Sequence, residues 1–236
     1  APVYVKHEVV HNKVVVADLR DRGAIFVEDI DEIPDDSLVI FSAHGVSSAV
    51  EEETKTRNLN FFDATCPLVT KVHMEVRKHA KASKDIILVG HEGHPEVEGT
   101  MGRHINSDNS SIYLVQNEFD AKNVRINNPT KLALVTQTTL SVDETKSIIH
   151  ILKHRFPDID IPKKDDICYA TQNRQDAVKQ LALESDFMIV VGSKNSSNSN
   201  RLSELAEKCG CRSILIDEFT DIDLNDLKNY SKISIT

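Results

Sequence analysis

The chain has 236 residues, enough to bury a sizeable core, and its 40% hydrophobic and 28% charged residues are typical of a globular protein. Its 28 Lys and Arg against 37 Asp and Glu give a formal net charge of −9, which argues against a nucleic-acid partner or an anionic membrane surface. No apolar run approaches the length of a membrane span and no signal peptide opens the sequence, so we expect a cytoplasmic protein.

Short β-branched and aromatic runs alternate with helical patterns, which predicts βα units around parallel sheets. A helix is expected to begin just after Cys66, because Pro67 suits the first helical position, and another is expected over 141–156. The alternation over 232–235 resembles one more strand. The other expected strands cover 3–5, 24–27, 38–42, 59–64, 85–89, 112–115, 132–136, 186–191 and 213–216.

The polar loops after these strands form a repeat. Cys66 lies 25 residues before the loop that begins at His91, and Cys168 lies 25 residues before the loop that begins at Ser193. A third copy of the loop begins at His7, so its cysteine should lie upstream of residue 1. The repeat predicts an α/β protein of three pseudo-repeated lobes with small parallel sheets, the first and third lobes incomplete. The expected boundaries are 1–66, 67–167 and 168–236.

Ligands of parallel α/β sheets bind at the carboxyl ends of the strands, where helix amino termini also point. All of the strand-end loops are therefore expected to face one centre. Cys66 and Cys168 each precede a helix, where a thiolate is a good metal ligand or nucleophile. Taken singly, each cysteine is better explained as a small buried apolar residue, and their matched positions in the repeat favour the ligand interpretation. Cys209 and Cys211 lie outside the repeat and are expected to be structural.

Several polar side chains follow strands and are candidates for binding an anion or moving a proton. His11, His44 and His94 all follow strands, and a cluster of imidazoles and hydroxyls can hold a diphosphate by hydrogen bonds. The loop of Ser196, Ser197 and Asn198 offers further donors, unless it is only a helix cap. Glu96, supported by Thr138, is the candidate proton donor, although an exposed glutamate at a helix start is the simpler interpretation when the repeat is ignored.

One motif indicates a different function. The stretch from His7 to His11 reads H-E-x-x-H, in which two helical histidines bind zinc and Glu8 activates water. The motif follows a short strand directly and shares its place in the repeat with a loop that cannot bind zinc this way. A zinc metallopeptidase remains an alternative.

Long blocks of the sequence resemble the 4-hydroxy-3-methylbut-2-enyl diphosphate reductase family. The resemblance runs from Val3 to Thr236. The stretches that resemble the family are HEVVHN at 7–12, FSAHGV at 41–46, FDATCPLVTKVH at 62–73, GHEGHPEVEGT at 90–100, TQTTLS at 136–141, DDICYAT at 165–171 and VGSKNSSNSNR at 191–201.

This resemblance implies a central [4Fe–4S] cluster with Cys66 and Cys168 as two of its ligands. It implies reductive dehydroxylation of the allylic diphosphate to isopentenyl and dimethylallyl diphosphate, with electrons from ferredoxin or flavodoxin. His11, His44, Ser196, Ser197 and Asn198 would bind the diphosphate, with His94 nearer the reacting end. Glu96, assisted by Thr138, would donate protons.

The family's first cysteine, in a GFCAGV stretch, and its last serine loop have no counterpart in this sequence. We therefore expect an incomplete record of the enzyme, inactive alone. A non-catalytic remnant that still binds a diphosphate is the remaining alternative.

Overall fold

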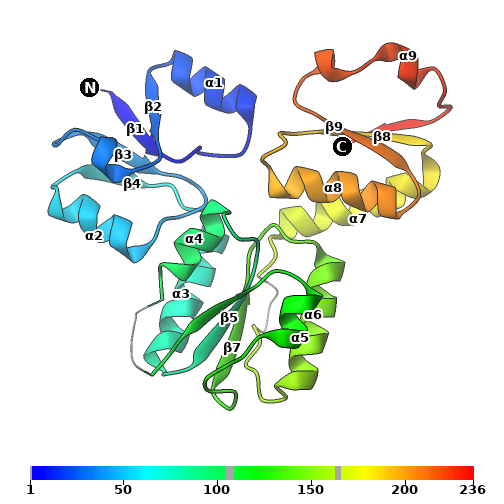
Figure 1. The fold of residues 1–236 in the computed structure, drawn as a ribbon. Helices are drawn as coiled ribbons and strands as arrows, with labels where there is room; N and C mark the ends of the chain where they lie inside the picture. Colours follow the sequence, from blue (N-terminus) through cyan, green and yellow to red (C-terminus); the bar gives the residue numbers. More distant parts are fainter. Residues whose placement is uncertain (1, 105–108, 163–165) are drawn as a thin grey trace. The chain divides into compact units, whose positions relative to one another are not determined.

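The structure is a computed structural model that describes residues 2–104, 109–162 and 166–236 (Figure 1). The chain divides into two compact units, each described by itself below. Unit 1 comprises Ala1–Val10, Asp18–Thr138 and Asp143–Asp166. Unit 2 comprises His11–Ala17, Thr139–Val142 and Ile167–Thr236.

Unit 1 contains a four-stranded parallel sheet in the order β2-β1-β3-β4. Its strands are β1 (Val3–Lys6), β2 (Ala24–Val27), β3 (Leu38–Phe41) and β4 (Asn60–Asp63), with the helices η1 (Ile30–Glu32) and α2 (Ser48–Thr56) between them. The helix α1 (Lys13–Asp21) follows β1 in the chain, and the division between the two units falls within it, after Ala17. Val39 and Phe41 of the interior strand β3 are almost completely buried and anchor the core of this sheet. β4 is an exposed edge strand, so the β propensity of Phe61 and Phe62, rather than a buried apolar run, indicates a strand there.

A second parallel sheet of unit 1 has the order β6-β5-β7. Its strands are β5 (Asp85–Val89), β6 (Ile112–Val115) and β7 (Leu132–Thr136), and its helices are α3 (Pro67–Lys81), α4 (Pro95–Met101), α5 (Glu118–Asn123) and α6 (Val142–Arg155). Every residue of β5 and β7 is buried, as expected of a parallel sheet with helices on both faces. Figure 1 shows α3 and α4 on one side of the sheet and α5 and α6 on the other.

Unit 2 contains the third parallel sheet, in the order β10-β8-β9. Its elements are α7 (Tyr169–Glu184), β8 (Phe187–Val191), α8 (Ser197–Lys208), β9 (Arg212–Ile216), η2 (Phe219–Asp221), α9 (Leu224–Leu227) and β10 (Ile233–Ile235). Val178 of α7, Val190 of β8 and Leu202 of α8 are completely buried in one cluster, so both helices cover the same face of the sheet.

The expected fold class is confirmed, because three small parallel α/β sheets are present and their strands lie within about a residue of the expected ranges. The alternation near the end of the sequence forms β10, as expected. The proposed lobe boundaries at residues 66 and 167 remain a prediction. No helix in the described part of the chain is long and apolar enough to cross a membrane.

Candidate functional site

A buried carboxyl group forms the centre of the site in unit 1. Glu96, in the first turn of α4, is only 2% exposed. Its Oε1 accepts a hydrogen bond from the backbone N–H of Thr138 at 2.6 Å, and its Oε2 accepts one from the Thr138 hydroxyl at 2.9 Å. Thr138 follows β7, so the carboxyl group lies at the carboxyl end of that strand, as the sequence predicted. The interpretation of Glu96 as an exposed glutamate is therefore wrong.

Burial changes the chemistry of this carboxyl group. It raises the pKa of Glu96 from 4.5 to about 7, and the two hydrogen bonds from Thr138 oppose the rise without cancelling it. The charge of nearby Asp166 adds to the rise. A carboxyl group that titrates near neutral pH can both give and regain a proton during turnover, which suits a general acid.

His94 lies beside Glu96 as the N-cap of α4. Its Nδ1 accepts a hydrogen bond from the backbone N–H of Glu96 at 3.1 Å. An accepting Nδ1 carries no proton, so the proton of the neutral ring is on Nε2, which acts as a donor. The ring of His44 meets His94 edge to face, with 5.6 Å between ring centroids. Two of the three predicted imidazoles therefore lie together in unit 1.

Close backbone packing sets the position of His44. Gly45, which follows it, has a φ of +74°, and a Cβ there would lie 2.5 Å from Cε1 of His73. A Cβ on Gly99 of α4 would lie 3.1 Å from the carbonyl oxygen of Gly45. Both glycines allow the loop after β3 to lie between α3 and α4. His73 is itself buried, and its pKa falls to about 4 through burial and the charges of Arg103 and Arg77.

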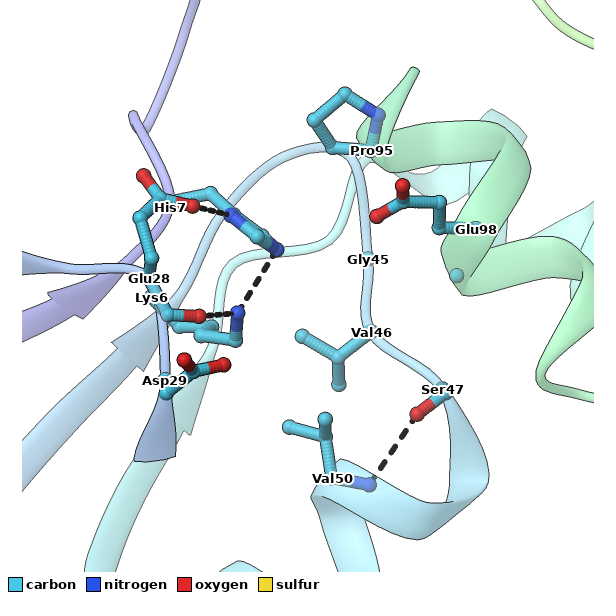
Figure 2. Close-up of a pocket in the computed structure, with 11 residues that line it drawn as sticks. Lys6, His7, Glu28, Asp29, Gly45, Val46, Ser47, Val50, Pro95 and Glu98 are labelled. Atoms are coloured by element: carbon cyan, nitrogen blue, oxygen red, sulfur yellow. Dashed lines mark hydrogen bonds and ion pairs between the residues drawn. The ribbon is translucent and has the colours of Figure 1, made fainter. Parts of the chain in front are cut away.

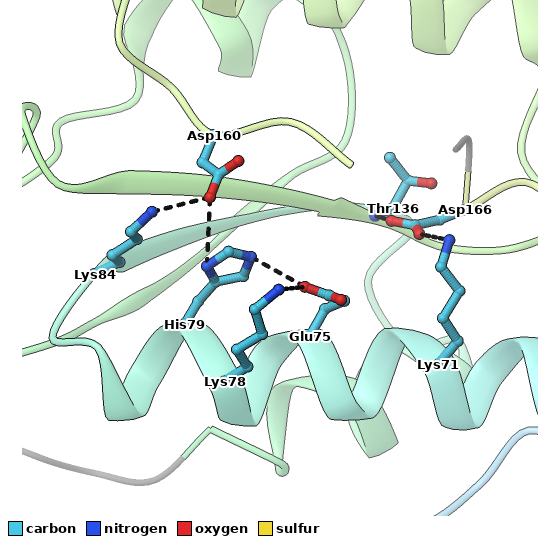
Figure 3. Close-up of polar contacts among 8 residues, drawn as sticks. All are labelled: Lys71, Glu75, Lys78, His79, Lys84, Thr136, Asp160 and Asp166. Carbon is cyan, nitrogen blue, oxygen red and sulfur yellow. Dashed lines mark hydrogen bonds and ion pairs between the residues drawn. The ribbon is translucent and has the colours of Figure 1, made fainter. Parts of the chain in front are cut away.

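A partly buried ion pair anchors the loop whose Thr138 binds Glu96. Asp166, with a fully buried side chain, accepts hydrogen bonds from Lys71 Nζ at 2.9 Å and from the backbone N–H of Thr136 at 3.1 Å (Figure 3). This contact fixes the end of β7, two residues before Thr138. Figure 3 also shows that Asp160 contacts His79, near the end of α3, and Lys84, just beyond that helix. These contacts connect the segment around Asp160 to the end of α3.

Both predicted cluster ligands occupy equivalent positions in their units. Cys66 is the N-cap of the 15-residue helix α3 in unit 1, and Cys168 is the N-cap of the 16-residue helix α7 in unit 2. Both thiols are free and partly exposed, and neither makes a side-chain capping hydrogen bond. A sulfur at the amino end of a long helix is favourably placed to bind a metal as the thiolate. This donor chemistry fits an iron–sulfur cluster.

Unit 2 holds the remaining predicted residues. Ser196 is the N-cap of α8, where its Oγ accepts from the backbone N–H of Ser199, and Ser197 and Asn198 form the first turn. The cap interpretation is therefore correct for Ser196, although a cap does not exclude ligand binding. The buried Oδ1 of Asn198 has no hydrogen-bond partner among the described residues.

His11 belongs to the same unit and lies just before α1. Two residues later, the backbone N–H of Lys13 donates to Ser193 Oγ at 3.0 Å. This bond ties the segment that follows His11 to the loop that leads into Ser196.

The zinc interpretation of the H-E-x-x-H stretch is wrong. The motif requires two histidines on one helix, whereas residues 7–12 are not helical and α1 begins only at Lys13. His7 has a φ of +62°, which no α-helix contains. Within the described residues, no group of three or more His, Cys, Asp or Glu side chains is arranged to hold a metal ion.

Sequence reasoning missed the residues that support the site. Gln137 is buried and its Oε1 accepts the backbone N–H of His91, which fixes the loop before His94. His73 and the Lys71–Asp166 pair were also not predicted. The sequence pattern indicated only that His73 lies on the buried face of a helix. A residue with a purely structural role has the same pattern.

The sequence of the whole chain matches one protein family and its members. The family model described as LytB protein matches residues 1–236. A 4-hydroxy-3-methylbut-2-enyl diphosphate reductase of Pseudomonas putida is 61% identical over 235 residues, covering 100% of this chain and 75% of the relative. One from Saccharophagus degradans is 59% identical, covering 100% and 76%.

Two solved structures of diphosphate reductases are similar to the structure of this chain. The E-1-hydroxy-2-methyl-but-2-enyl-4-diphosphate reductase of Plasmodium falciparum is similar with a TM-score of 0.94 and 41% identity, covering 100% of this chain and 73% of that one. A second structure, described as the terminal enzyme of the non-mevalonate pathway, has a TM-score of 0.67 and 28% identity, covering 100% and 82%.

The three parallel sheets and these matches define an α/β oxidoreductase of the LytB class. The chain belongs to the 4-hydroxy-3-methylbut-2-enyl diphosphate reductase family, as its sequence blocks predicted.

Proposed function

We propose that the enzyme to which this chain belongs carries out the reductive dehydroxylation of 4-hydroxy-3-methylbut-2-enyl diphosphate to isopentenyl and dimethylallyl diphosphate. Two electrons and two protons enter, the allylic C–O bond breaks, and water leaves. The observation that carries the proposal is the buried carboxyl group of Glu96, whose pKa of about 7 and bonds to Thr138 suit a proton donor. Membership of the family supports the choice of substrate.

Cys66 and Cys168 are two of the proposed protein ligands of a [4Fe–4S] cluster. Their free thiols at the N-caps of α3 and α7 support this role. When bound, such a cluster supplies an open iron that acts as a Lewis acid towards the substrate hydroxyl, and it relays electrons that ferredoxin or flavodoxin delivers.

The two oxygens of Glu96 would have different roles in proton delivery. Oε1 is occupied by the backbone N–H of Thr138, so the acid proton belongs on Oε2, opposite the Thr138 hydroxyl. That hydroxyl can accept the proton from Oε2 and donate its own proton onwards. The first proton leaves with the departing hydroxyl group as water, and the second, after Glu96 regains a proton, goes to the allylic carbon.

The diphosphate would be bound by imidazole, hydroxyl and amide groups of the strand-end loops rather than by surface cations. We assign this role to His11 and His44, and to the loop of Ser196, Ser197 and Asn198. His94 would donate from Nε2 nearer the reacting carbon, because its Nδ1 is already engaged. Hydrogen bonds from these side chains and from helix amino termini explain how an acidic chain can bind an anion.

Glu96→Gln tests the proton donor in the anaerobically reconstituted full-length enzyme. The amide keeps the size of the side chain and removes its acid proton, so turnover should be lost while calorimetry still detects substrate binding. Glu98→Gln is the matched control, because Glu98 is exposed on the same helix and should leave turnover unchanged. Full turnover in Glu96→Gln would remove Glu96 from this role.

Cysteine substitutions test the cluster independently of turnover. Cys66→Ser and Cys168→Ser should each lower the bound iron and the visible absorption of reconstituted protein. Cys209→Ser is the control, because Cys209 is the C-cap of α8 rather than an N-cap. Iron content equal to that of the control in both variants would refute the assignment.

A further inference from the structure

An amine, an imidazole and a carboxylate form a linear array in unit 1, outside the residues assigned above. Lys6 ends β1 and is only 6% exposed. Its Nζ donates to the backbone carbonyl of Glu28 and lies 3.0 Å from Nε2 of His7. On the other side of the imidazole ring, Nδ1 of His7 lies 2.7 Å from Oε2 of Glu28 (Figure 2).

The partners of His7 define its tautomer. The Glu28 carboxylate can only accept a hydrogen bond, so the ring proton is on Nδ1 and Nε2 has a free lone pair directed at Lys6. This is the arrangement of a nucleophile, its base and the group that orients the base. The backbone of His7 has a left-handed conformation, with a φ of +62°. Residues other than glycine rarely adopt it, and such residues cluster at functional sites.

The array opens into a cavity of about 320 Å³. Lys6, His7 and Glu28 line one side, and Pro95 and Glu98 of α4 line the opposite side (Figure 2). Val46 and Val50 contribute apolar surface. A cavity of this size holds a small molecule, and it gives Lys6 access despite the low exposure of its side chain.

The charged residues that line the cavity determine which kind of small molecule can bind there. Glu28, Asp29 and Glu98 all border the cavity, so an anionic ligand would be repelled. Burial lowers the pKa of Lys6, although the same carboxylates oppose this effect. A partly desolvated amine next to a base is more nucleophilic than an exposed lysine.

We propose that Lys6 is a covalent binding site for small neutral aldehydes, with His7 as its base and Glu28 as the residue that positions His7. Nothing in the reductase chemistry uses these three side chains, so the site is independent of the proposed function.

The reaction needs no external reactant besides the aldehyde. Nε2 of His7 accepts a proton from the Lys6 ammonium group, and the free amine attacks the carbonyl carbon. A C–N bond forms while the carbonyl oxygen takes a proton from the amine, which gives a carbinolamine. His7 then returns its proton to the departing hydroxyl, water leaves, and a protonated imine remains on Lys6.

Reductive trapping measures this reactivity. The protein is treated with propionaldehyde and cyanoborohydride, and the extent of alkylation at each lysine is read by peptide mass spectrometry. Lys81 is the internal reference, because it is exposed on α3. We expect Lys6 to react about tenfold faster than Lys81 despite its burial. Unfolding in urea should bring the ratio to about one, because all general-base assistance is lost.

Two variants separate base catalysis from simple access. His7→Asn removes the base, and asparagine tolerates a positive φ, so the ratio should fall about tenfold. Glu28→Gln changes a largely exposed side chain, and it should lower the ratio by a smaller factor. Glyoxylate, an anionic aldehyde, should show a smaller preference for Lys6 than propionaldehyde does. A native ratio at or below one, or a ratio that neither variant changes, would overturn the proposal.

Discussion

Replacing the buried Glu96 by glutamine should make the protein more stable at alkaline pH. The carboxyl group has to ionise in a buried environment above its pKa of about 7, whereas glutamine stays neutral. Glutamine can also keep both contacts with Thr138. Its oxygen can accept the backbone N–H, and its amide group can donate to the hydroxyl, which rotates to accept.

The sign and size of the effect follow from the shifted pKa. The folded protein binds more protons than the unfolded chain between pH 4.5 and about 7, so the stability contributed by protonated Glu96 is complete below pH 4.5 and is lost as the pH rises through about 7. The full loss is about 3 kcal/mol, of which about 2 kcal/mol falls between roughly pH 5.5 and 8.5. Other titrating groups cancel when the variant is compared with the parent.

Urea unfolding of both proteins at several pH values measures the difference. The gain in free energy of unfolding for Glu96→Gln should grow by about 2 kcal/mol over this interval. Glu98→Gln should show no such trend, because Glu98 is exposed. A difference for Glu96→Gln that stays constant with pH would refute the argument that burial holds this carboxyl group neutral.

Three further substitutions test the packing of unit 1 by thermal or urea unfolding. Gly45→Ala should cost about 1–3 kcal/mol, because the new Cβ would meet His73 at 2.5 Å in a left-handed conformation, and an unchanged midpoint would contradict this packing. Asp85→Ala should cost about 2–4 kcal/mol, because its buried carboxylate accepts two backbone N–H groups, each at 2.9 Å, and full stability would show that water replaces it. Lys71→Met should cost about 1–3 kcal/mol, because it leaves Asp166 buried without its cation. This range is lower than for a fully buried pair because Lys71 is 38% exposed, and no loss of stability would mean that the pair contributes little.

Much of the fold was predictable because strands of a buried parallel sheet carry continuous apolar runs. Ile86, Ile87 and Leu88 are completely buried in β5, and the sequence marks them clearly. The equal intervals from Cys66 and Cys168 to their following loops also reflect a structural equivalence, since both cysteines are N-caps of long helices.

The supporting contacts were not predictable, because they join residues far apart in sequence. Asp166 meets Lys71 across 95 positions, and no local pattern marks either residue as a partner. His73 has the spacing of an ordinary helical core residue. The contact of His7 with Glu28 likewise joins residues 21 positions apart, and a five-residue motif does not contain it.

The apolar interior is divided among separate clusters, and this division has a consequence for how the native protein opens. One cluster surrounds β3, another surrounds β5, and a third lies between α7, α8 and β8. Each is small, so a local opening can expose one cluster to solvent while the amides of the others stay protected. Hydrogen–deuterium exchange of the native state should then resolve into several foldons rather than one global event. A bound ligand would slow exchange most in the foldons that supply its contacts.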